Sequence, residues 1–193
     1  THYPMKIACF ARGVALGFSL AVTAGASPLQ DKVRAYRIAH EQELMTEYRE
    51  LVSLPNVGAD QPNIRRNADF ILAMMKRRGI PAELLEGRTR ATNPAVFGEI
   101  RVPGASRTVV FYAHYDGQPV NPKEWAEGLD PWSPVFLTAP MTKGGKIVTD
   151  WKPGDAINPD WRINGRASAD DKAGVFSILN AYTALAAGGT RPT

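Results

Sequence analysis

Cysteine is almost absent from this sequence of 193 residues, whose single thiol is Cys9. If the first 26 residues are removed, the remaining chain has no cysteine at all. Such a chain forms no disulfide and offers neither a thiolate ligand for zinc nor a cysteine nucleophile. The sequence also lacks His-Glu-x-x-His and Gly-x-Ser-x-Gly. The zincin and serine-hydrolase sites that depend on these motifs are therefore excluded.

A strong charge of one sign is also missing. The formal net charge is +4, from 23 basic and 19 acidic residues. Residues 1–26 contain Lys6 and Arg12 but no acid, so the remainder has a net charge of only +2. This surplus is too small for a nucleic-acid-binding surface, and we expect no nucleic-acid partner. Hydrophobic residues make up 44% of the chain and charged residues 22%, a balance typical of a globular domain.

Residues 5–26 have the layout of a secretory signal peptide. Lys6 and Arg12 precede an uncharged run of about 13 residues, and Ala24-Gly25-Ala26 supplies small residues for cleavage. The run is shorter than the roughly 20 residues that span a bilayer. We therefore expect an exported protein, periplasmic or secreted, with a signal peptide over 1–26 and no stable membrane anchor. Residues 1–4 are interpreted as an upstream extension.

The remaining pattern predicts an α/β domain. Apolar residues at helical spacing predict helices over 31–54, 63–78 and 170–189, and strand-like runs occupy 80–86, 95–102 and 107–114. Between 117 and 165 lies a long irregular segment with four tryptophans and a short strand over 145–150. The order predicts a layered domain in which helices flank a mixed central sheet. The last helix should return the chain to another strand, so we expect the sequence to end in mid-fold.

Two polar residues follow the apolar run "VVFYA", namely His114 and Asp116. Residues two apart in a strand face the same side, so their side chains should lie side by side. Ligands in α/β sheets bind beyond the carboxyl ends of strands, where an imidazole and a carboxylate suit zinc, manganese or cobalt. An incidental polar pair at a strand end is the alternative interpretation.

A second acidic cluster, Asp170-Asp171, stands where the third predicted helix begins. Helix capping is one explanation, with Ser168 as N-cap and the two acids complementing the helix dipole. The other is a metal site, because the two oxygens of one carboxylate can bridge two metal ions.

The segments "HYDGQP" and "GRASADDKAG", with His114 and Asp170 56 positions apart, together resemble the dimetal peptidases of the aminoacylase, carnosinase and glutamate carboxypeptidase type. The stretch from "LVSLPNVGADQPN" to "MMKRRGIPAELLE" is similar to the opening helices of that family. "NPAVFGEI" is similar to its first strand. The resemblance covers nearly all of residues 27–193, which we interpret as the N-terminal part of a phosphorylase/hydrolase-like zinc exopeptidase domain.

The resemblance implies a set of roles. His114 would bind one metal, Asp170 would bridge two, and Asp116 would take part in catalysis by orienting His114. The Asp170–Asp171 peptide bond would be cis. The cofactor would be two divalent ions, zinc or alternatively cobalt or manganese. The reaction would be hydrolysis of a small peptide or an N-acyl amino acid by a metal-activated water. A homodimer would form if the family's inserted domain exists.

The sequence also departs from the family. The general base of that family belongs to a Glu-Glu pair that has no counterpart here, and Glu83 and Glu86 lie upstream of both motifs. Further ligands are missing as well, so we expect an incomplete and inactive fragment of the catalytic domain. The rival hypothesis is a non-catalytic exported binding domain that uses the tryptophan-rich segment for recognition. In that case His114, Asp116 and Asp170 are strand-end and capping residues.

Overall fold

The computed structural model describes residues 27–89 and 92–190. The predicted signal peptide lies outside the described residues. In these described residues, four α-helices and four short strands follow one another in the order α1 (Pro28–Ala39), α2 (Glu41–Ser53), α3 (Gln61–Arg77), β1 (Ala82–Leu85), β2 (Ala95–Gly98), β3 (Val135–Leu137), β4 (Arg162–Asn164) and α4 (Lys172–Ala187). Within the described part of the chain, no helix is both long and apolar enough to cross a bilayer.

The first predicted helix is in fact two helices. A capping box at Ser27 starts α1, with the Ser27 hydroxyl accepting from the Gln30 amide. The backbone leaves the helical conformation at His40, whose ψ is 13°, and α2 begins at the next residue. The His40 ring stacks on Tyr36 at 4.0 Å and bonds the Tyr36 carbonyl oxygen through Nδ1. The prediction of one continuous helix over 31–54 was wrong, because periodicity continues across a local break of this kind.

The other predicted helices are confirmed within two residues at each end. Asp60 caps α3 by accepting from the Asn63 amide, and Gly79 follows the helix with a positive φ of 70°. A residue without a Cβ adopts this left-handed conformation at little cost, which ends the helix. The core lies where α2, α3 and α4 meet, and its buried residues are Leu51, Ile71, Met74, Ile80, Val175 and Leu179.

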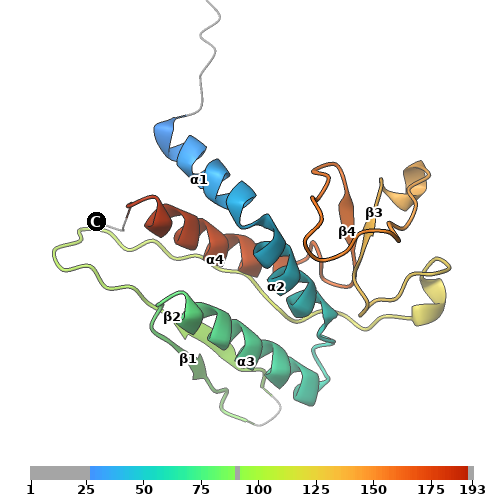
Figure 1. Ribbon diagram of the computed structural model, residues 1–193. Helices are drawn as coiled ribbons and strands as arrows, with labels where there is room; N and C mark the ends of the chain where they lie inside the picture. The colour runs from blue at the N-terminus through green and yellow to red at the C-terminus, as the bar shows by residue number, and fades with distance from the viewer. Residues whose placement is uncertain (1–26, 90–91, 191–193) are drawn as a thin grey trace, which may run out of the picture.

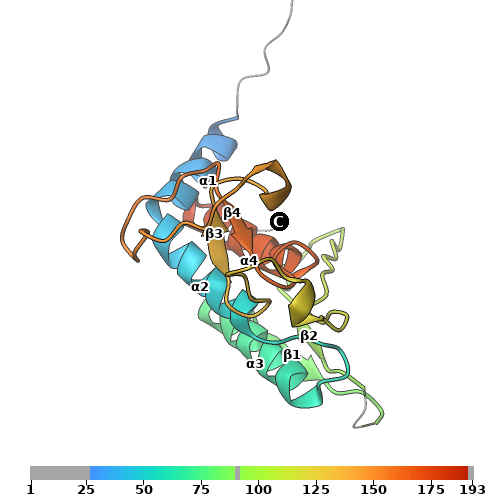
Figure 2. The same ribbon diagram turned by 90° about the vertical axis from the view of Figure 1, so that its right-hand side faces the viewer.

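The strands form two separate antiparallel pairs. In the first, Ala82 of β1 pairs with Gly98 of β2, and the pair packs against α3 (Figure 1). In the second, Val135 of β3 pairs with Asn164 of β4, on the side of the molecule that faces the viewer in Figure 2. The predicted short strand at 145–150 contributes one bridge, between Ile147 and Leu137. Both sheets are two-stranded, so a layered domain with a mixed central sheet stays a prediction.

The prediction of a strand over residues 107–114 was wrong. The segment runs in an extended path past α4 without forming a strand (Figure 1). In the described part of the chain, no backbone hydrogen bond pairs residues 108–113. The side chains from Val109 to Tyr112 are between 71% and 84% exposed. Strand conformation depends on a partner for the backbone N–H and C=O groups, and none of the described residues provides one for this segment.

The tryptophan-rich segment packs onto α2. Phe136 of β3 meets Trp151 edge-on with ring centroids 5.2 Å apart, and Trp161 lies 5.7 Å from the same ring. The Arg49 guanidinium of α2 lies 5.2 Å from the centroid of Trp151. Cation–π and edge-to-face contacts of this kind stabilise a fixed arrangement. Two of the four tryptophans, Trp151 and Trp161, therefore pack against other residues of the fold.

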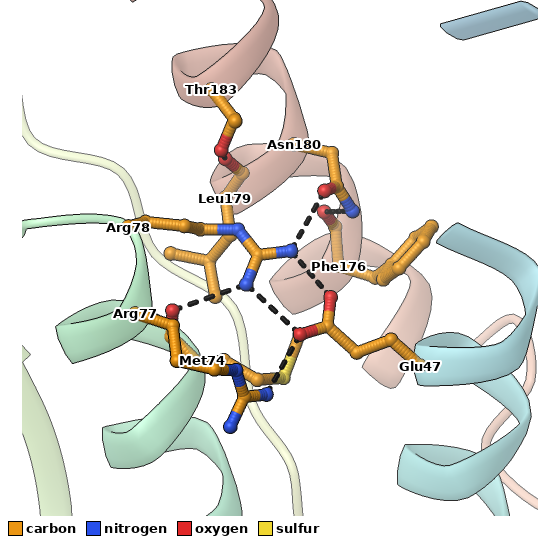
Figure 3. Close-up of polar contacts among 8 residues, drawn as sticks. All are labelled: Glu47, Met74, Arg77, Arg78, Phe176, Leu179, Asn180 and Thr183. Carbon is orange, nitrogen blue, oxygen red and sulfur yellow. Dashed lines mark hydrogen bonds and ion pairs between the residues drawn. The ribbon is translucent and has the colours of Figure 1, made fainter. Parts of the chain in front are cut away.

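An ion-pair network joins the three core helices (Figure 3). Glu47 of α2 accepts from Arg77 at 2.8 Å and from both terminal nitrogens of Arg78, just beyond α3. Arg78 also donates to Asn180 Oδ1 of α4 at 2.8 Å. Burial opposes ionisation of Glu47, but the hydrogen bonds from Arg78 and Arg77 outweigh it and lower the pKa of its carboxyl group.

This lowered pKa predicts a loss of stability in acid. The folded-state pKa of Glu47 lies below its unfolded value, so its contribution is present above the unfolded value and disappears as pH falls through the folded one. We expect the free energy of unfolding to decrease between about pH 5 and about pH 3, and less steeply in Glu47→Gln. Urea unfolding at a series of pH values measures the difference. Glu43→Gln, an exposed position on the same helix, is the control and should keep the wild-type slope. Equal slopes in wild type and Glu47→Gln would contradict the prediction.

Candidate metal centre

His114 and Asp116 lie side by side, as the sequence predicted, although the segment before them is not a strand. His114 Nδ1 is 3.0 Å from the backbone carbonyl oxygen of Asp116 and 3.4 Å from its carboxylate Oδ1. Because a carbonyl oxygen accepts only, the Nδ1–H of the ring donates to it. The His114 side chain is 37% exposed and that of Asp116 49% exposed. The pair therefore stands at the surface, open to a ligand.

The acidic pair stands at the start of α4. Asp171, not Ser168, is the N-cap: its Oδ1 accepts from the Gly174 amide at 3.1 Å. The prediction of Ser168 as cap was wrong by three residues. The other oxygen of Asp171 accepts from the backbone N–H of His114 at 3.3 Å. The Asp170–Asp171 peptide bond is cis, as the resemblance implied. Asp171 thus joins the helix start to the His114 segment and leaves Asp170 free to project outward.

The two predicted ligands meet. His114 Nε2 is 2.9 Å from Asp170 Oδ1, and the Asp170 side chain is 90% exposed. Burial lowers the pKa of His114, but its hydrogen bonds to the Asp116 carbonyl and to Asp170, together with both carboxylate charges, raise it above the ordinary value. One ring nitrogen of His114 therefore faces a carboxylate, while the other is held by the backbone.

Lys172, the first residue of α4, supports this arrangement from the interior of the fold. Its side chain is fully buried, and Nζ donates to the carbonyl oxygens of Leu51 and Leu54 at 2.8 and 2.7 Å. Burial lowers the pKa of the ammonium group to about 7. Lys172 is the only charged residue in α4, a sign in the sequence of a special position. It fixes the start of α4 to the end of α2.

Tyr48 and Asn56 were missed by sequence reasoning. The Tyr48 hydroxyl donates to the Ser168 carbonyl oxygen, and burial together with the negative charge of Asp171 raises its pKa to about 12. Asn56 is fully buried and donates through Nδ2 to the Tyr115 carbonyl oxygen at 2.8 Å. Both come from segments far away in the sequence, and only the tertiary structure brings them to the site.

The donor set is suitable for a divalent metal but small. An imidazole nitrogen and a carboxylate are ligands that zinc, manganese and cobalt accept. In residues 27–89 and 92–190, no group of three or more His, Cys, Asp or Glu side chains is placed to hold a metal ion. Catalytic zinc sites use three protein ligands. His114 and Asp170 supply two candidate donors, one fewer than such a site uses.

The comparison with curated proteins supports a distant relation to metallopeptidases. The chain is 28% identical over 154 residues to the Cys-Gly metallodipeptidase dug1 of Schizosaccharomyces pombe. The match covers 75% of this chain and 28% of the relative, so the chain spans little more than a quarter of that protein's length. No family model matches the chain, and no solved structure matches it.

Proposed function

We propose that this chain is part of a metal-dependent hydrolase of peptide or amide bonds, in which His114 and Asp170 are metal ligands. The observation that carries the proposal is the contact between these two side chains. His114 Nε2 lies 2.9 Å from Asp170 Oδ1, although the residues are 56 positions apart in the sequence. The distant similarity to a metallodipeptidase makes a dipeptide, such as Cys-Gly, the first substrate to test. Exopeptidase and N-acyl amino acid amidohydrolase activities are the alternatives within the same reaction class.

Each residue has a defined task in this proposal. His114 provides the lone pair of Nε2, and Asp170 provides an exposed carboxylate that has room for a second ion. The backbone carbonyl and carboxylate of Asp116 orient the ring, and Asp171 holds the His114 amide in place. When bound, one or two divalent ions, in our proposal zinc, would supply an activated water at neutral pH.

Hydrolysis would need more than the described residues provide. Among them, no third ligand joins His114 and Asp170, and a metal-activated water also needs a general base that accepts its proton. We infer that polypeptide equivalent to the part of the relative that this chain does not cover supplies both groups. The 193-residue chain alone should then bind metal weakly and hydrolyse nothing. Export and the metallopeptidase-domain boundary at residue 27 remain proposals from the sequence.

Metal binding by the chain itself tests the ligand assignment. Calorimetric titration with zinc should show at least about tenfold weaker binding for His114→Ala and for Asp170→Ala, because each substitution removes one of the proposed metal ligands. His40→Gln is the matched control, since His40 stacks on Tyr36 within the helical region and should leave zinc affinity unchanged. Equal zinc affinity of wild type, His114→Ala and Asp170→Ala would contradict the proposed site.

A further inference from the structure

The candidate metal centre offers two donors, whereas zinc uses more. Structural zinc sites have four protein ligands, and catalytic sites have three. In the described part of the chain, the imidazole of His114 meets the carboxylate of Asp170, and no third side chain completes a metal-binding group. A zinc ion held by this pair therefore keeps about two of its four coordination positions open to donors from another molecule.

The two donor atoms are already spaced for one ion. Two ligand atoms at bonding distance from a tetrahedral zinc ion are about 3.3 Å from each other. His114 Nε2 and Asp170 Oδ1 are 2.9 Å apart, so a movement of about 0.4 Å brings them to that spacing. The His114 backbone N–H is bonded to Asp171, whereas the described residues give Asp170 no hydrogen bond besides the one with His114. The Asp170 side chain can therefore make this movement.

The surface around the pair is open. The Asp170 side chain is 90% exposed and that of His114 37% exposed. Ala169, directly before Asp170, is exposed, and so is Gln118, at the end of the turn that follows His114. The pair thus lies where another protein molecule can reach it.

A second copy of this chain carries the donors that are missing. Its own His114 and Asp170 form the same pair, and two pairs related by a twofold axis supply two nitrogens and two oxygens. Four donors of this kind complete a tetrahedral zinc site. Without the ion, the carboxylates of the two copies repel each other, and Asp116, at 49% exposure, adds negative charge on each side. Association through this surface should therefore require the metal.

We propose that two copies of this chain share one zinc ion between their pairs of His114 and Asp170, as a zinc-dependent twofold dimer. The inference rests on the ligand roles that the proposed function gives to these two residues. The second copy occupies the coordination positions that hydrolysis needs for a further ligand and for water. A shared ion and a complete hydrolytic site are therefore alternative states of the same pair.

Sedimentation velocity of the full chain during a zinc titration tests the proposal. The mean mass should rise with zinc and peak near one ion per two chains. It should fall again in excess zinc, when each chain binds an ion of its own. EDTA should reverse the rise, and the same sample in EDTA is the baseline for association of any other origin. Magnesium prefers a shell of oxygen ligands and should not replace zinc.

Substitutions at the pair should remove this response. His114→Ala and Asp170→Ala should each need at least about tenfold more zinc for the same rise in mass, because each removes half of the donors that the shared ion uses. Asp170 is the safer position, since replacing an exposed side chain rarely disturbs a fold. His40→Gln and Asp150→Ala are the matched controls. His40 stacks on Tyr36, and Asp150 is an exposed aspartate outside the site, so both variants should keep the wild-type zinc dependence.

The possible outcomes separate this inference from the proposed function. Binding of one zinc ion per chain without a rise in mass would overturn the shared ion and leave the ligand roles of His114 and Asp170 standing. A chain that binds no zinc would contradict both. A zinc-dependent rise of wild-type size in His114→Ala or Asp170→Ala would place the ion elsewhere and also overturn the proposal.

Discussion

Replacing Arg78 by alanine is expected to lower the free energy of unfolding by about 3–5 kcal/mol, the usual cost of breaking a buried ion pair from one side. The Arg78 side chain is only 10% exposed and that of Glu47 16% exposed. Arg78 also donates to the Met74 carbonyl oxygen at 3.1 Å and to Asn180 at 2.8 Å. The substitution leaves a partly buried carboxylate and an amide without their main donor.

Arg77 provides a matched control for this prediction. It is the neighbouring residue, carries the same charge and donates to the same Glu47 carboxylate at 2.8 Å, but its side chain is 54% exposed (Figure 3). Exposed ion pairs contribute about 1 kcal/mol or less, so Arg77→Ala should cost far less than Arg78→Ala. Urea unfolding followed by circular dichroism gives both values. Similar losses of unfolding free energy in Arg77→Ala and Arg78→Ala would contradict the prediction that the buried arginine contributes more.

The exposed run Val109–Tyr112 is expected to make this chain self-associate in solution. Four adjacent apolar side chains are exposed, and their backbone is unpaired in the described part of the chain. Below them, a cavity of ≈330 Å³ lies between the run, β2 and α4. Unpaired extended segments with apolar side chains pair with copies of themselves. A second copy of the same run would cover both the backbone edge and part of this surface.

Val110→Lys should weaken this association by at least about tenfold, because burying one valine contributes about 1.5 kcal/mol or more. Sedimentation velocity over a concentration series measures the change. Ile38→Lys is the control: Ile38 is 58% exposed, but its backbone belongs to helix α1, and the substitution should leave association unchanged. A wild-type chain that is monomeric at all concentrations, or equal effects of the two lysines, would contradict the prediction.

The helices and the two proposed metal ligands were within reach of sequence reasoning. The apolar spacing of α3 and α4, the cap at Asp60 and the glycine after α3 are local signals, and each acts within a few residues. The pairing of His114 with Asp116 is also local, because only Tyr115 separates them. The proximity of Asp170 to His114 came from the resemblance of two motifs, and the structure places these side chains 2.9 Å apart.

The errors have physical causes that act beyond the local window. The pattern of residues 107–114 records a strong preference for strand, but a strand exists only where another strand supplies backbone partners. Helical periodicity passes through His40 without a gap, although the backbone leaves the helical conformation there; this break is local, but the spacing of apolar residues does not record it. Asp171, the cap in place of Ser168, also accepts from the backbone N–H of His114, 57 positions away.

The sequence by itself thus indicated the helical segments and the pair of residues proposed to bind metal. Only the tertiary structure decided what holds that pair. Asn56 and Lys172 act through backbone carbonyl groups of residues 59 and more than 100 positions away. Backbone acceptors are present at every position and leave no mark in a sequence. Their selection by one buried side chain therefore becomes visible only when the chain is folded.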